Sequence, residues 1–138
     1  MTKKLAEYSI SELAPLIKSK SVSPVEVLDS VLEQIHKKNS TLNAFIEVFE
    51  NEARQSAYQA EQEIMQGHYK GPLHGIPIAS KANIYIKGKR INVGSYIHRD
   101  FVPDDHATVI QKLQDAGVVL TGILNMHEYA YGFTTDNP

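Results

Sequence analysis

A strand, a helix and a second strand follow one another between residues 75 and 122, and this order restricts the fold more than any other feature of the chain. The first strand is expected at 75–81. The second, at 118–122, begins with three consecutive apolar residues, which is typical of a parallel strand covered on both faces. A helix at 105–116 separates them. Because parallel neighbours need such a crossover, the sequence predicts a βαβ unit and an α/β fold with a small, mostly parallel sheet.

A helical layer is expected before this unit. Apolar residues recur at helical spacing over 9–19 and 24–39, and a third helix is expected at 51–66, where Gly67 ends it. The segment 43–49 between the second and third helices is rich in aromatic and β-branched residues, which fits either a short strand or an extended link.

Polar residues mark the expected helix ends. A capping box needs Ser, Thr, Asp or Asn at the N-cap and Glu or Gln three residues later. The expected caps are Ser9 with Glu12 for the first helix, Ser23 with Glu26 and with Pro24 at the first helical position, Asp104 or Asp105 for the crossover helix that Gly117 ends, and Asn125 with Glu128 for a short helix near the C-terminus.

Composition excludes several classes of function. The 138 residues include no cysteine, which rules out disulfides, thiolate nucleophiles and cysteine-ligated metals. The net charge of -2 and the pI near 6.3 disfavour nucleic acid and anionic lipid as partners. No apolar run approaches the ~20 residues of a membrane helix, and the N-terminus has no leader pattern, so we expect a cytoplasmic protein without a membrane partner.

Neither a metal nor a cofactor is expected. None of the six histidines is spaced as a ligand pair, and His127-Glu128 starts like a zinc-protease motif but has Tyr131 where the second histidine belongs. The glycines form no nucleotide-binding loop, because Gly71 and Gly75 precede the predicted strand.

Lys81 is the candidate for chemistry. The segment 81–99 holds five basic residues and no acid, a pattern typical of a solvated loop, with a local anion or RNA contact as the alternative. Lys81 stands at the end of an apolar strand, where desolvation would favour a neutral amine able to act as a base. The residue types alone do not separate this role from a lysine that reaches water.

Several blocks, in order, resemble the amidase signature family. GPLHGIPIASKAN at 71–83 is similar to its first signature block, and Gly94-Ser95 and 105–117 continue the likeness. ILNMHEYAYG at 123–132 is similar to the family's Asn-Met-x-Glu-Phe-Ala run. The helical N-terminus, with Asn43-Ala44-Phe45, is similar to the amidotransferase A subunits of that family. The resemblance implies that 1–138 is one N-terminal portion of an amidase-signature domain, with 1–67 helical and 71–138 the start of its α/β core.

The resemblance implies a Ser–cis-Ser–Lys amidase mechanism, in carboxamide hydrolysis or glutamine-dependent amidotransfer. Lys81 matches the family's catalytic lysine, the general base. Both serines belong to a Gly-Ser-rich block beyond the point that matches Pro138, so we expect these residues alone to be inactive. Ser80 and Ser95 are expected to be structural. The sequence departs from the family at Ser80 (usually aliphatic), Ala82 (aspartate), Ile123 (lysine) and His127 (aspartate).

Two other hypotheses remain. In the first, the chain is a noncatalytic binding or scaffold protein that self-associates or pairs with a C-terminal half. In the second, it is an independent enzyme that uses Lys81 for Schiff-base or acid–base chemistry. A partial sheet exposes strand edges and an apolar face, so we expect a homo-oligomer or a complementary C-terminal fragment to cover it.

Overall fold

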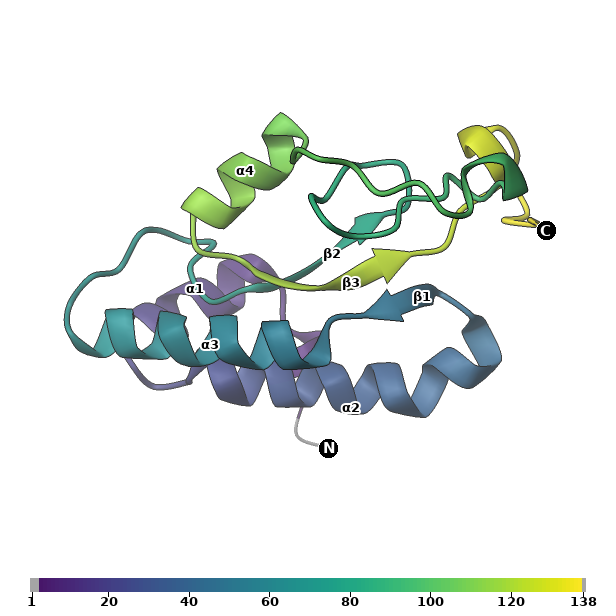
Figure 1. Cartoon of the computed structure of the whole chain (residues 1–138). Helices are drawn as coiled ribbons and strands as arrows, with labels where there is room; N and C mark the ends of the chain where they lie inside the picture. Colours follow the sequence, from purple (N-terminus) through teal and green to yellow (C-terminus); the bar gives the residue numbers. More distant parts are fainter. Residues whose placement is uncertain (1–2, 138) are drawn as a thin grey trace.

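A computed structural model describes residues 3–137. Within that range the chain forms four α-helices, three strands and three single 3₁₀ turns. Figure 1 shows three layers: helices α1, α2 and α3 on one side of the sheet and helix α4 on the other. The helices are α1 (Ile10–Lys18), α2 (Pro24–Leu42), α3 (Glu50–Met65) and α4 (Thr108–Asp115); the strands are β1 (Phe45–Val48), β2 (Pro77–Lys81) and β3 (Val119–Leu124).

The predicted caps of the first two helices are confirmed. Ser9 accepts a hydrogen bond from the Glu12 amide, and the Glu12 carboxylate accepts one from the Ser9 amide at 2.7 Å. Ser23 and Glu26 begin α2 with a capping box, and Pro24 occupies its first turn. These caps satisfy amides that have no partner inside the helix, so both helices begin where the sequence indicates.

The predicted caps of the two later helices are wrong. Neither Asp104 nor Asp105 caps α4, because its N-cap is Ala107, whose amide donates to the Tyr85 carbonyl at 2.8 Å. Asn125 begins no helix. Its side chain accepts from the Met126 amide, and only the 3₁₀ turn Glu128–Ala130 follows. In both places contacts with distant segments prevail over the local capping preference; those of Asn125 are hydrogen bonds that it donates to the Asn43 and Ala44 carbonyls.

The sheet has the strand order β1-β3-β2 and is mixed. β2 pairs with β3 in parallel, from Pro77 opposite Val119 to Lys81 opposite Leu124, which confirms the predicted βαβ unit with α4 in its crossover. The segment left open as strand or link is a strand, β1, and it pairs with β3 antiparallel. The sheet therefore has one parallel and one antiparallel pairing, whereas the sequence predicted a mostly parallel one.

Apolar side chains fill both spaces between the layers. Leu28 and Leu32 of α2 and Ala57 of α3 pack with Val119 on one face of the sheet. Ile110 of α4 packs with Ile123 and with the loop that follows β2 on the other face. β3 is therefore covered on both faces, as its continuously apolar sequence predicts.

Candidate functional site

Lys81 is the last residue of β2, at the carboxyl end of the parallel pair. Its side chain is exposed, whereas its neighbours Ser80 and Ala82 are buried, so the desolvation that the sequence led us to expect at Lys81 is not found among the described residues. Within residues 3–137 the Lys81 ammonium makes no ion pair and no hydrogen bond. Ligands of open α/β sheets bind at the carboxyl ends of parallel strands, so Lys81 stands where a substrate would be expected.

Backbone hydrogen bonds hold the segments around Lys81 together. The Ala82 amide donates to the Leu124 carbonyl at 3.1 Å, and the Ala82 carbonyl accepts from the Val93 amide at 3.0 Å. The Val93 carbonyl in turn accepts from the Tyr129 amide at 2.9 Å. The segments after β2 and after β3 therefore meet at this edge of the sheet, as Figure 1 shows for the turns near the C-terminus.

The backbone is strained where these segments meet. Val93 has a φ of 48° and Tyr129 a φ of 51°, although both carry a Cβ, and for the β-branched Val93 this conformation is exceptional. Such residues persist only where their surroundings fix them, and they concentrate at functional sites. Here the two hydrogen bonds of Val93 fix it.

The two serines nearest to Lys81 in sequence make no contact with its ammonium. Ser95 is buried, and its hydroxyl accepts from the Ile97 amide to cap the 3₁₀ turn Tyr96–His98. Ser80 points to the opposite face of β2, because successive strand residues alternate. Within the described range neither serine can relay a proton to Lys81.

Ser80 carries an isolated polar atom. Its side chain is 5% exposed, and its Oγ has no hydrogen-bond partner among the described residues. An unsatisfied buried hydroxyl costs about 1–3 kcal/mol. We therefore expect Ser80→Ala to raise the free energy of unfolding by about 1 kcal/mol, measured by urea denaturation.

Thr121 provides the matched control for this prediction. It is equally buried, and its Oγ1 donates to the Ile78 carbonyl at 3.1 Å. Thr121→Val should therefore lower the free energy of unfolding by about 1 kcal/mol. A loss of stability in both variants would show that the Ser80 hydroxyl has a partner.

His74 links three parts of the fold. Its ring is 1% exposed; Nδ1 accepts from the Lys70 amide at 3.2 Å, and Nε2 lies 3.1 Å from Glu63 Oε2 on α3. Lys70 reaches the same carboxylate oxygen at 2.7 Å. The ring also fills the space beside Gly117, where any Cβ would overlap it. Sequence reasoning missed this residue, although its apolar neighbours and flanking glycines indicate burial.

The fold should lose stability as His74 becomes protonated in the unfolded chain. Burial, followed by the nearby Lys70 charge, lowers the pKa of His74 below its ordinary 6.5. The unfolded chain therefore binds the proton first as the pH falls, and the free energy of unfolding decreases from pH 6.5 towards pH 5. Urea denaturation across this range measures the decrease, and His74→Gln should make it shallower. An equal slope in both proteins would contradict the assignment.

One of the loop cations is paired with an acid of α3. Lys89 pairs with Glu52 of α3 at 2.6 Å and lies 4.1 Å from the Phe49 ring, so part of the basic segment 81–99 is neutralised. No group of three or more His, Asp or Glu side chains in the described part of the chain could hold a metal ion. None of its helices is long and apolar enough to cross a membrane.

Known proteins are similar to this chain in both sequence and fold. A family model described as Amidase matches residues 26–138. The A subunit of the glutamyl-tRNA(Gln) amidotransferase of Geobacillus kaustophilus is 37% identical over 133 residues, which cover 96% of this chain and 27% of that protein. An amidase of Pseudomonas putida is 37% identical over 131 residues, which cover 95% of this chain and 28% of that protein.

A solved structure from the same group of enzymes is also similar to this chain. The crystal structure of a bacterial aryl acylamidase belonging to the amidase signature enzymes has a TM-score of 0.85 and 31% identity, over 94% of this chain and 27% of that protein. The chain thus spans little more than a quarter of the length of the proteins that it matches.

Proposed function

The chain belongs to the amidase signature family, and on that premise we propose that it forms the N-terminal segment of a carboxamide-cleaving enzyme in which Lys81 is the general base. The observation that carries the proposal is the position of Lys81. It ends the parallel strand β2, exposed and free of ion pairs within residues 3–137, in a segment that resembles the family's first signature block.

The proposed chemistry follows the resemblance. In the proposed relay the Lys81 amine accepts a proton from a bridging serine, which takes one from the attacking serine. The attacking oxygen forms a bond with the carboxamide carbon and the C–N bond breaks. The amide nitrogen takes the proton back through the same relay and leaves as ammonia, and water or another acceptor then attacks the acyl carbon and frees the serine. Hydrolysis and glutamine-dependent amidotransfer share these steps and differ in the fate of the ammonia. Hydrolysis releases it, whereas amidotransfer passes it to a second substrate.

These 138 residues alone should be inactive. The described part of the chain places neither Ser80 nor Ser95 on Lys81, and a base without a nucleophile cannot start acyl transfer. The family's two serines belong to the Gly-Ser-rich block that follows the segment matched here. Lys81 therefore needs the rest of an amidase fold to act.

A chimera tests this proposal. In it, this chain replaces the matched 131 residues of the Pseudomonas putida amidase. Ammonia release from primary carboxamides is measured for the chimera and for the 138-residue chain. We expect release from the chimera only. Release from the chain alone, or none from a folded chimera, would contradict the proposal.

A second candidate function is a noncatalytic scaffold that self-associates. It is favoured by the large apolar side chains that the fold leaves exposed, such as Ile97 at 80% and Tyr131 at 90%. Sedimentation at high micromolar concentration tests it: a dimer or larger oligomer supports self-association, and a monomer excludes it.

A further inference from the structure

Asn125 joins two segments of the fold at the end of β3. Its backbone amide donates to the Ala44 carbonyl at 2.8 Å, and its side-chain Nδ2 donates to the Asn43 carbonyl at 3.2 Å. Both acceptors lie in the short link between α2 and β1. The strand register places Lys81 opposite Leu124, the residue before Asn125. Asn125 therefore ties the start of β1 to the strand end that lies beside Lys81.

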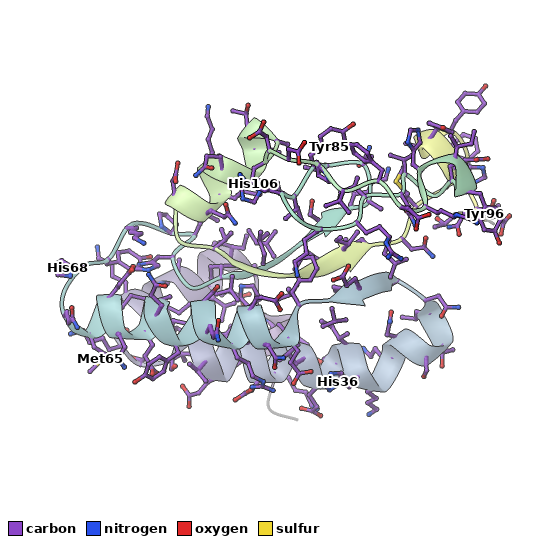
Figure 2. The ribbon with its side chains drawn as sticks, in the orientation of Figure 1. His36, Met65, His68, Tyr85, Tyr96 and His106 are labelled. Carbon is purple, nitrogen blue, oxygen red and sulfur yellow. The ribbon has the colours of Figure 1, made fainter. Side chains whose placement is uncertain are left out.

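The side-chain oxygen of Asn125 also holds a residue twelve positions further along the chain. Asn137 Nδ2 donates to Asn125 Oδ1 at 2.7 Å and to the Met126 carbonyl at 2.8 Å. The chain thus leaves the end of β3 and returns to it. Figure 1 shows the last described residues at this end of the sheet, and Figure 2 shows Tyr96, from the segment after β2, at the same end.

These contacts use most of the hydrogen-bonding capacity of the Asn125 carboxamide. Oδ1 accepts from the Met126 amide at 2.9 Å and from Asn137, and Nδ2 donates to Asn43, so three of its four hydrogen-bonding positions are filled. The reversed amide would set donor against donor at both Oδ1 contacts, which fixes its orientation. An aspartate would keep the two acceptor contacts and lose only the bond to Asn43. One substitution can therefore separate the two contacts.

We propose that Asn125 is a positioning residue for the amidase reaction, because its Oδ1 holds Asn137 and so sets where, relative to Lys81, the chain starts towards the catalytic serines. The inference rests on the proposed function, in which those serines belong to the Gly-Ser-rich block after the matched segment. Proton transfer from a serine to Lys81 needs the two atoms within about 3.2 Å of each other. A misplacement of about 1 Å can lower the rate by roughly 10²-fold, even when the altered residue touches no substrate.

NMR of the 138-residue chain tests the contact itself. The side-chain amide protons of Asn137 should resonate away from the positions of a free asparagine amide, and Asn125→Ala should return them to those positions. Asn125→Asp should not, because an aspartate oxygen still accepts the bond. An Asn137 amide that resembles a free one in the unaltered chain would overturn the proposal.

Initial rates of ammonia release by the Pseudomonas putida chimera test the positioning role. Asn125→Ala and Asn137→Ala should each lower kcat by about 10- to 100-fold, with KM changed less than about threefold. The double variant should lose no more than either single one, because both act through one contact. Asn125→Asp should keep kcat within about threefold, although the lost bond to Asn43 lowers its Tm. The matched control is Asn51→Ala, an exposed position on α3, which should change neither constant more than about twofold.

Three results would overturn the positioning role. They are an unchanged kcat in Asn137→Ala, additive losses in the double variant, and equal losses in Asn125→Asp and Asn125→Ala, which would assign the effect to the bond with Asn43. A folded chimera that releases no ammonia contradicts the proposed function alone. Crystal structures of that chimera and of its Asn137→Ala variant then decide: a Gly-Ser-rich block displaced relative to Lys81 supports the positioning role, and an unmoved block overturns it.

Discussion

Lys81→Met is expected to lower kcat of the chimeric amidase by about 10²–10⁴-fold, the usual contribution of a general base. Methionine keeps most of the length of the side chain and removes the amine that accepts the proton. Lys81→Arg should fail similarly, because a guanidinium stays protonated and cannot serve as a base. The loss should appear in kcat more than in KM, since the amine acts on the proton that moves in the transition state. Initial rates of ammonia release measure both constants.

Lys87→Met is the control for this prediction. Lys87 is an exposed lysine in the same loop region, and its side chain has no role in the proposed relay. Its replacement should change kcat less than about twofold, as expected for a surface position away from the chemistry. An equal loss in the Lys87 and Lys81 variants would show that the charge of this region, and not the Lys81 amine, supports catalysis.

Gly122→Ala is expected to lower the free energy of unfolding by about 3 kcal/mol, because it overpacks the centre of the sheet. Gly122 lies in β3, between Val48 of β1 and Ala79 of β2. A Cβ at this position would overlap the Glu47 carbonyl oxygen and would lie 3.2 Å from the Val48 Cα. Backbone atoms cannot swing aside as a flexible side chain does, so β1 must separate from β3. Urea denaturation of the 138-residue chain measures the loss.

Gly88→Ala separates this steric effect from the general cost of replacing glycine. Gly88 has a φ of 73°, and nothing lies within 4 Å of the position that its Cβ would take. Its replacement should cost only the strain of a left-handed conformation, about 1 kcal/mol. Equal losses at the two positions would show that β1 can yield to the extra methyl group.

Local patterns predicted most of the fold. The capping boxes at Ser9 and Ser23 fix helix starts because they satisfy amides within a few residues of the serine. The apolar run at 118–120 predicted a strand buried on both faces, and both faces are covered. In each case the deciding interaction is short-range or follows from burial alone.

Features decided by distant contacts were not predictable in the same way. The strand at Phe45–Val48 depends on pairing with β3, more than 70 residues away. α4 begins at Thr108 and not at 105. The Ala107 amide donates a hydrogen bond to the Tyr85 carbonyl, and Ala107 is the N-cap in place of Asp105. Such contacts have no signature within a short window of sequence.

Some features of the candidate site were also predictable from the sequence, and others were not. The position of Lys81 at the end of a strand was predictable from the apolar run before it, and the structure places it there. The strained loop at Val93 and the buried ring of His74 were not, because both depend on segments that meet only in the folded chain. The role of Lys81 stays a prediction that rests on the family resemblance.

A crystal structure of the active chimera would show whether Lys81 is the base of an amidase relay. We expect Lys81 Nζ to lie within hydrogen-bond reach, about 2.6–3.2 Å, of one serine hydroxyl of the Gly-Ser-rich block. A second serine should lie at the same distance from the first. An ammonium that points into solvent, with another side chain on the bridging serine, would contradict it.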